Sequence, residues 1–265
     1  MSSKTLRAAV LRTAAVVAVL AIAFGCGGGE QEKKAAVEEQ PAATGAFWEP
    51  TGEEGDLTGK VSFQGQPPKF PPISMDADAA CAAMHSGRVY PDAVVVNGNG
   101  TLKNVFVYVK SGLEGKNMRV PDVPVELDQK GCIYEPHVVG IQARQNLRIV
   151  SSDQTTHNIH PMPKTNREWN ISQPPGADPI IQTFSRPEVS IPVKCNQHPW
   201  MRAYIHVVNH PFYAVSGEDG SFTLKGLPPG DYEIEAVHEH YGAQVQKVTV
   251  PPKGAATADF TYAAG

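Results

Sequence analysis

Apolar residues recur at every second position along most of this chain, in short runs separated by Gly, Pro, Asn and Asp. Alternation with a period of two is typical of β-strands that bury one face. From Leu57 onward these runs are LTGKVSF, AVVVNGNG, NVFVYVK, NLRIV, EVSIPV, AYIHVV, SFTL, DYEIEAV and QKVTV. Only residues 76–85 have a helix-like spacing. The pattern therefore predicts an all-β fold made of β-sandwiches.

The first 25 residues have a different pattern. A basic, acid-free start is followed by an apolar run that ends at Phe24. The run is shorter than the roughly 20 apolar residues that cross a bilayer, so residues 1–25 are predicted to be a secretory signal peptide. The residues at its end, Ala23-Phe24-Gly25-Cys26, resemble the cleavage box of bacterial lipoproteins, which implies lipidation of Cys26. Ordinary cleavage near Gly25 is the alternative, and both predict export to the cell envelope.

Composition and net charge lead to two further predictions, a flexible tether and the charge of the partner. Residues 26–56 are poor in β-branched residues and rich in Gly, Glu, Lys and Pro, which predicts a flexible tether because so little apolar surface can be buried. Without the signal peptide the chain has 20 basic and 27 acidic residues, a formal net charge of −7. This acidity argues against nucleic acid or an anionic lipid surface as the partner. No sequence after Cys26 is expected to span a bilayer, so a lipid at Cys26 is the only membrane attachment expected.

The candidate chemistry lies in Cys195-Asn196-Gln197-His198-Pro199-Trp200-Met201, which follows a predicted strand. A thiolate, an imidazole and a thioether on one tight loop suit copper, and a further imidazole is available upstream in residues 153–160. Two imidazoles and a thiolate form a trigonal plane acceptable to Cu(I) and Cu(II), with a weak axial thioether. The pattern predicts one mononuclear copper site. Zinc is the alternative, although Met is a poor zinc ligand.

These segments resemble the cupredoxin family over roughly residues 123–208. The loop CNQHPWM is similar to the short ligand loop of amicyanin, and HNIH is similar to the His-Asn motif of the family. By position, the resemblance implies four metal ligands: His157, Cys195, His198 and Met201. It also implies that Asn158 hydrogen-bonds around the Cys loop. His160 is the alternative to His157, and His157 is preferred because it precedes Asn158 as in the family.

The resemblance also implies a function. Cupredoxins carry single electrons, and their loop imidazole lies at the surface inside an apolar patch, which here implies that His198 is exposed between Pro199 and Trp200. An acidic surface would steer a basic c-type cytochrome toward this patch. A copper chaperone or sensor that delivers copper to an oxidase is the alternative function, and a structural module with a vestigial site is a third. No enzyme activity is expected, because nothing resembles a nucleophile with its base or paired carboxylates.

Two cysteines remain once Cys26 and Cys195 are assigned. In an oxidising compartment they predict one disulfide, between Cys81 and Cys132, which would pin residues 76–85 onto the cupredoxin core. A second metal site made of these two cysteines with His85 and His137 is the alternative.

Residues 209–265 resemble a second family. Their motifs DGSF and GLPPGDY are similar to the signature of the carboxypeptidase regulatory-like (transthyretin-like) β-sandwich, which is structural because its Gly and Pro residues make tight turns. Such a module opens with a strand like residues 57–65. We therefore expect the cupredoxin domain, residues 120–208, to be inserted into a split sandwich whose N-terminal part is residues 57–119. Two consecutive β-domains are the alternative.

Two further histidines, His238 and His240, lie two residues apart in a predicted strand and are expected on one face of it. Such a pair can bind a metal or a copper-delivery partner. The plainer interpretation is a pair of exposed residues at the end of a strand.

Overall fold

Nearly all of the regular secondary structure is β-strand, arranged in four sheets, in a computed structural model that describes residues 46–264. The predicted all-β fold class is confirmed, and the helix-like segment contains one short helix, α1 (Ala79–Ala83). Within residues 46–264 no helix is both long and apolar enough to cross a membrane. The predicted signal peptide and lipidated Cys26 lie outside the described residues, as does most of the predicted tether.

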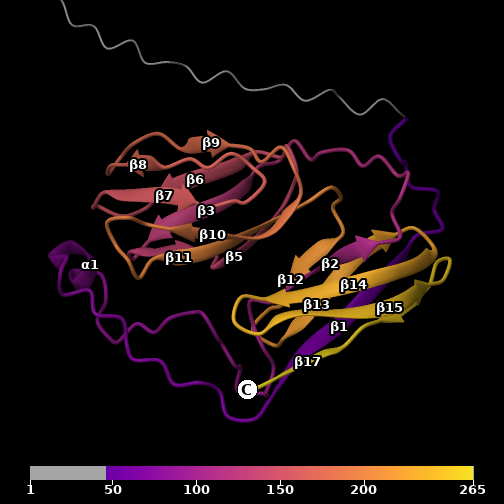
Figure 1. The fold of residues 1–265 in the computed structure, drawn as a ribbon, viewed down its shortest axis with the longest axis horizontal. Helices are drawn as coiled ribbons and strands as arrows, with labels where there is room; N and C mark the ends of the chain where they lie inside the picture. The colour runs from indigo at the N-terminus through magenta and orange to yellow at the C-terminus, as the bar shows by residue number, and fades with distance from the viewer. Residues whose placement is uncertain (1–45, 265) are drawn as a thin grey trace, which may run out of the picture. The chain divides into compact units, whose positions relative to one another are not determined.

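The first sandwich combines strands from both ends of the described chain. One sheet has the order β13-β1-β16, with β17 also paired to β1, and the other has the order β12-β2-β14-β15. Figure 1 shows the early strand β1 beside the late strand β17. The strands are β1 (Gly55–Gln64), β2 (Phe106–Ser111), β12 (Tyr213–Val215), β13 (Ser221–Leu227), β14 (Gly230–His238), β15 (Gly242–Val250), β16 (Ala255–Thr257) and β17 (Phe260–Ala263).

The second sandwich is formed by the chain between β2 and β12. Its five-stranded sheet has the order β5-β11-β10-β7-β8, and its four-stranded sheet has the order β4-β3-β6-β9. The strands are β3 (Val125–Lys130), β4 (Ile133–Glu135), β5 (Val138–Gln142), β6 (Leu147–Ser151), β7 (His157–Pro161), β8 (Ile171–Gln173), β9 (Ile180–Gln182), β10 (Glu188–Lys194) and β11 (Arg202–Val208). Because β1 and β2 pair with strands that follow β11, the strand pairing is that of a split sandwich with an insertion.

Each sandwich has its own apolar core, as the alternating pattern requires. Leu57, Phe222 and Ile234 belong to the core of the split sandwich, and Leu127 and Ile205 to that of the insertion. A smaller buried cluster joins strands of both, and its members are Phe106, Tyr108, Val138, Val208 and Val237.

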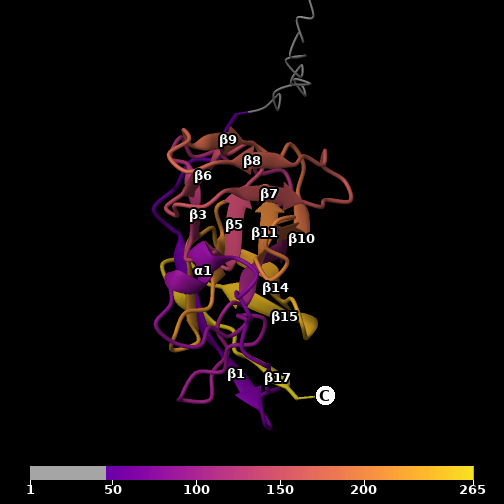
Figure 2. The same ribbon diagram turned by 90° about the vertical axis from the view of Figure 1, so that its left-hand side faces the viewer.

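Helix α1 lies outside the sheets, next to the inserted sandwich (Figures 1 and 2). Asp78 caps its N-terminus and accepts hydrogen bonds from the backbone N–H groups of Ala80 and Cys81. A disulfide joins Cys81 to Cys132, the pair expected from the cysteine count. Cys132 lies in the turn between β3 and β4, so this bond attaches the helix to the inserted sandwich.

The predicted tether is too long at its C-terminal end. The Trp48 N–H donates a hydrogen bond to the Asn117 carbonyl, and the Trp48 ring lies edge-on to Phe212. Glu49 pairs with Arg119. Residues from 47 onward are therefore attached to the fold. The packing of Trp48 on Phe212 and the Arg119 guanidinium over the exposed Phe47 ring offset the polar composition that predicted flexibility.

Candidate metal centre

Two neighbouring strands bring the predicted ligand segments together. His157 is the first residue of β7, and Cys195 directly follows the last residue of β10. The two strands pair antiparallel, with Lys194 opposite His160, so the start of β7 lies near the end of β10. This register explains how residues about 40 positions apart in sequence come to share one site.

The loop between β10 and β11 is closed by its own backbone. The Met201 N–H donates to the His198 carbonyl at 2.9 Å, and the Cys195 N–H donates to the Met201 carbonyl at 3.3 Å. Cys195 and Met201 belong to the core of the inserted sandwich, and Met201 is completely buried. The short loop therefore turns both sulfur-containing side chains toward the interior.

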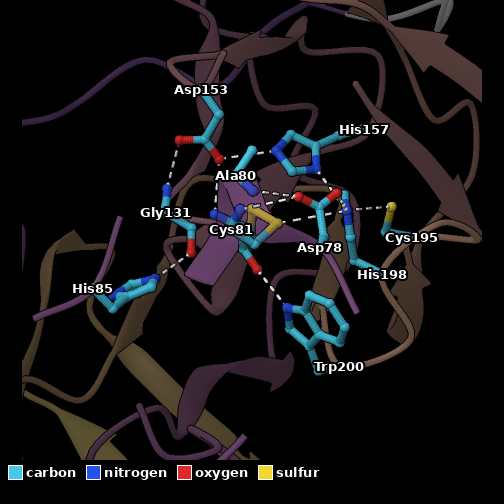
Figure 3. Close-up of a disulfide and its surroundings, with 11 residues drawn as sticks. Asp78, Ala80, Cys81, His85, Gly131, Asp153, His157, Cys195, His198 and Trp200 are labelled. Atoms are coloured by element: carbon cyan, nitrogen blue, oxygen red, sulfur yellow. Dashed lines mark hydrogen bonds and ion pairs between the residues drawn. A yellow bond between two sulfur atoms is a disulfide. The ribbon is translucent and has the colours of Figure 1, made fainter. Parts of the chain in front are cut away.

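Donor atoms of His157, Cys195 and His198 lie close together beside this loop (Figure 3). The Nδ1 atoms of His157 and His198 are 3.0 Å apart, and the Cys195 sulfur is 3.7 Å from the Nδ1 of His198. All three donor atoms lie within 4.8 Å of one another. All three residues are at most 3% exposed. The structure thus groups three of the four predicted ligands by their side chains, and Met201 adjoins them through its backbone.

Asn158 lies where the cupredoxin resemblance implies. Its side-chain oxygen accepts a hydrogen bond from the Asn196 N–H at 2.7 Å and is 3.3 Å from the Cys195 sulfur. The buried Tyr134 hydroxyl donates to the Asn158 carbonyl at 2.6 Å, which fixes the start of β7. These contacts hold the upstream segment and the ligand loop in one arrangement.

A carboxylate holds the outer edge of each imidazole. The Nε2 of His157 donates to Asp153 at 2.9 Å, and the Nε2 of His198 donates to Asp78 at 3.0 Å. Because an ionised carboxylate only accepts hydrogen bonds, each contact keeps a proton on Nε2 and leaves Nδ1 as the nitrogen that can bind a metal. Both Nδ1 atoms then face the same space.

Asp153 also organises the turn that carries the disulfide. It accepts the backbone N–H groups of Gly131 and Cys132, each at 2.7 Å. Burial raises the pKa of Asp153, but the His157 ring and these two N–H groups lower it to below its ordinary value overall. Asp153 is therefore ionised at neutral pH and links the turn to His157.

The expected surface position of His198 is wrong. Its ring is only 3% exposed, because Asp78, the Cys81 sulfur at 3.5 Å and the Trp200 ring surround it. Pro199 is exposed, and Trp200 is half-buried with its indole N–H donating to the Cys132 carbonyl. Nothing in the pattern of residues 76–85 indicates that this distant segment covers the ligand loop.

The thiol of Cys195 is poised to ionise. Burial raises its pKa, but hydrogen bonds from His157 and from backbone groups lower it to about 6 overall. Burial likewise lowers the pKa of His157, whereas Asp153 and Cys195 raise it to about 9. A thiolate beside a protonated imidazole is therefore the expected metal-free form between these two values.

The donor set fits one soft or borderline cation. Metal–nitrogen distances of about 2.0 Å and metal–sulfur distances of about 2.3 Å allow one ion to contact atoms separated by 3.0 and 3.7 Å. Converging lone pairs repel one another unless a proton or a cation lies among them. Two imidazoles and a thiolate, with a buried thioether on the same loop, suit copper better than zinc.

The alternative metal-site residues lie elsewhere. His160 contacts Glu168 and Asn196 and is outside the group of three. The alternative site of Cys81, His85, Cys132 and His137 is not assembled, because the two cysteines form a disulfide and each histidine has another partner. His85 binds the Gly131 carbonyl, and His137 pairs with Glu239.

His238 and His240 do not share a strand face, contrary to expectation. Strand β14 ends at His238, whose side chain is buried against Tyr241 and Tyr262. His240 lies in the following turn and is exposed. Gly242 begins β15 with a positive φ, so the turn signal in the sequence lies after both histidines and not between them.

Three residues at the centre were not singled out from the sequence: Asp78, Asp153 and Tyr134. Asp153 lies four residues before His157, a spacing that could have drawn attention to it. Asp78 precedes a helix-like segment as a capping residue does, but its contact with a histidine 120 positions away has no signal in the sequence.

We predict that Cys195 is a thiolate at neutral pH in the metal-free protein. With a pKa of about 6, the thiolate forms as the pH rises through 6 and is lost below it, whereas an unperturbed cysteine has a pKa of about 8.5. The measurement is thiolate ultraviolet absorbance against pH, taken as the difference from Cys195→Ala. Replacing His157 by Gln should raise the midpoint, and a midpoint at the unperturbed value in the unaltered protein would contradict the assignment.

Parts of this chain are similar to known proteins. Residues 194–263 match the family model of the carboxypeptidase regulatory-like domain. This range begins at the last residue of β10, just before the ligand loop, and runs through the C-terminal strands of the split sandwich. No curated protein matches the chain.

Solved structures with a similar fold include copper proteins. A purple cupredoxin from Nitrosopumilus maritimus is 17% identical, with 32% of this chain and 99% of that chain covered and a TM-score of 0.28. A mutant of amicyanin in its Cu(I) form is 17% identical, with 38% of this chain and 98% of that chain covered and a TM-score of 0.29.

A Cu-containing nitrite reductase from Thermus scotoductus SA-01 is 18% identical, with a TM-score of 0.31. The match covers 37% of this chain but only 25% of that enzyme. At these scores the likeness carries no argument about function. The chain is thus similar to the carboxypeptidase regulatory-like family over residues 194–263, and cupredoxins are among its structural neighbours.

Proposed function

We propose that this protein is an exported, lipid-anchored type 1 copper protein that carries single electrons between redox partners. One observation supports the proposal above all others. The Nδ1 atoms of His157 and His198 and the sulfur of Cys195 converge within 4.8 Å in a buried site, on a loop that also buries Met201.

Bound copper would supply a one-electron couple between Cu(I) and Cu(II). The surrounding residues of the chain hold the proposed ligands rigidly. His157 is held by Asp153, His198 by Asp78, and the Cys195 loop by Asn158. Ligand side chains that are hydrogen-bonded on the side away from the metal stay in place when the charge of the metal changes. A site that does not rearrange favours fast electron transfer over exchange of its ligands.

Burial of the site favours electron transfer over substrate chemistry. His157, Cys195 and His198 are at most 3% exposed, so no open position is available for a substrate. The same burial favours a carrier over a chaperone that delivers copper, because delivery requires a partner ligand to reach the metal. We therefore propose no enzymatic role.

Trp200 is the side chain that connects the buried centre with the surface. Its ring centroid is 5.2 Å from that of His198, and the residue is half-buried. The neighbouring Pro199 is exposed. With His198 itself covered, we propose that partners exchange electrons at Trp200 and Pro199, a small apolar surface suited to brief docking.

The partner that we propose is a basic c-type cytochrome or another redox protein of the envelope. The chain without its predicted signal peptide has a formal net charge of −7, which attracts a cationic partner. Anchoring through a lipid at Cys26 would keep the protein at the extracytoplasmic face of the membrane.

Removing the thiolate should abolish the proposed centre. We expect Cys195→Ser to lose the intense blue absorption, which requires a copper–thiolate bond. Met201→Leu should keep copper bound and shift the reduction potential upward, because a weak axial donor is replaced by an apolar group. Visible spectra and voltammetry of the copper-loaded protein measure both effects. A Cys195→Ser protein that stays blue would overturn the ligand assignment.

Replacing the connecting ring should slow electron exchange without altering the metal site. We expect Trp200→Leu to slow reduction by a cationic c-type cytochrome while the visible spectrum stays the same. Trp200→Phe is the matched control, since it keeps a ring beside His198 but loses the indole N–H. Stopped-flow rates measure the effect. Equal rates for the Leu and Phe variants would exclude Trp200 as the site of exchange.

A further inference from the structure

Asp78 contacts the metal centre from outside the inserted sandwich. It belongs to the segment between β1 and β2, and one of its carboxylate oxygens lies 3.0 Å from the Nε2 of His198 (Figure 3). We propose that Asp78 is a positioning residue of the metal centre, presented by a disulfide-anchored helical cap. The inference rests on the proposed function, since it names what orients one ligand of that centre.

The two oxygens of Asp78 have separate partners. Oδ1 accepts the backbone N–H groups of Ala80 and Cys81 at 2.9 and 3.1 Å, which caps helix α1. Oδ2 is left for His198. Capping therefore fixes the carboxylate in one orientation, with its second oxygen directed at the imidazole.

The chemistry of the contact determines which nitrogen of His198 can bind a metal. A carboxylate accepts but does not donate, so it retains the proton on Nε2 and keeps the Nδ1 lone pair free. That Nδ1 atom faces the Nδ1 of His157 and the Cys195 sulfur. Asp153 does the same for His157 from within the inserted sandwich, so Asp78 completes a matched pair of carboxylates.

The alternative partners of this Nε2 atom cannot replace Asp78. The Cys81 sulfur, 3.5 Å away, belongs to the disulfide and accepts hydrogen bonds weakly. Water could enter because the Asp78 side chain is 28% exposed. Water both donates and accepts, however, so it would leave the ring free to change its tautomer.

The cap is anchored at the turn that also holds Asp153. Cys81 is bonded to Cys132, and the His85 ring lies 2.7 Å from the Gly131 carbonyl. Asp153 accepts the two N–H groups of the same turn. A covalent bond and a hydrogen bond thus keep Asp78 opposite His198, although the two residues are 120 positions apart in sequence.

The test separates positioning from helix capping. Ser is a good capping residue but is too short to reach His198, so Asp78→Ser removes one role and keeps the other. Asp78→Asn keeps the shape but can present an amide donor to Nε2. The matched control is Asp76→Asn, which removes the same charge from the same segment at an exposed residue that contacts Ser74.

Two measurements on the full chain test whether Asp78 positions His198. We expect copper affinity, measured by competition with a chelator, to fall roughly 10- to 100-fold in Asp78→Ser and Asp78→Asn. In the metal-free protein, the Nε2–H of His198 should exchange with solvent faster in both variants, as followed by nuclear magnetic resonance. Asp76→Asn should match the unaltered protein in both measurements.

Unchanged copper affinity and unchanged exchange of the ring N–H in both Asp78 variants would reduce Asp78 to a helix cap and overturn the proposal. If Asp78→Ser fails to fold, Asp78→Asn decides by the same criteria. If the unaltered protein binds no copper, the proposed function fails, but the exchange of the His198 ring N–H in the metal-free protein still decides whether Asp78 holds this imidazole.

Discussion

The Nδ1 atoms of His157 and His198 lie 3.0 Å apart, which is hydrogen-bonding distance when one of them carries a proton, and both rings are held at their opposite edges. Asp153 and Asp78 accept the Nε2 protons of His157 and His198, so the two Nδ1 atoms and the Cys195 sulfur are turned toward the same space. Such an arrangement is unfavourable without a cation or a proton. In the metal-free site a proton on the His157 ring fills this role at neutral pH, and a bound cation would replace it.

This constraint extends into the surrounding fold through one turn. The backbone groups of Gly131 and Cys132, both with positive φ, are bound by side chains from three other segments: Asp153, His85 and Trp200. The disulfide adds Cys81 to this turn. The hairpin between β3 and β4 thus links one ligand through Asp153 and the other through the helical cap. The indole ring of Trp200, which lies beside His198, is hydrogen-bonded to the same turn.

Local patterns predicted the parts of the site, whereas long-range packing decided how they are covered. The alternation of apolar residues was sufficient for the β-strands, and the spacing of Cys195, His198 and Met201 was sufficient to place a thiol, an imidazole and a thioether on one tight loop, since both are local properties. The burial of His198 was missed because it depends on Asp78, whose only local sign is that of a helix cap. Likewise, Phe47 and Trp48 attach a segment whose average composition predicts a flexible tether.

The central claim is that one copper ion is held by two imidazoles and one thiolate in a site that does not rearrange on reduction. X-ray absorption spectroscopy at the copper edge, on the full chain loaded with one equivalent of copper, tests this claim most directly. We predict two nitrogen ligands and one short sulfur ligand in both oxidation states, with nearly unchanged distances. A spectrum without a short copper–sulfur distance, or with a coordination number that changes on reduction, would contradict it.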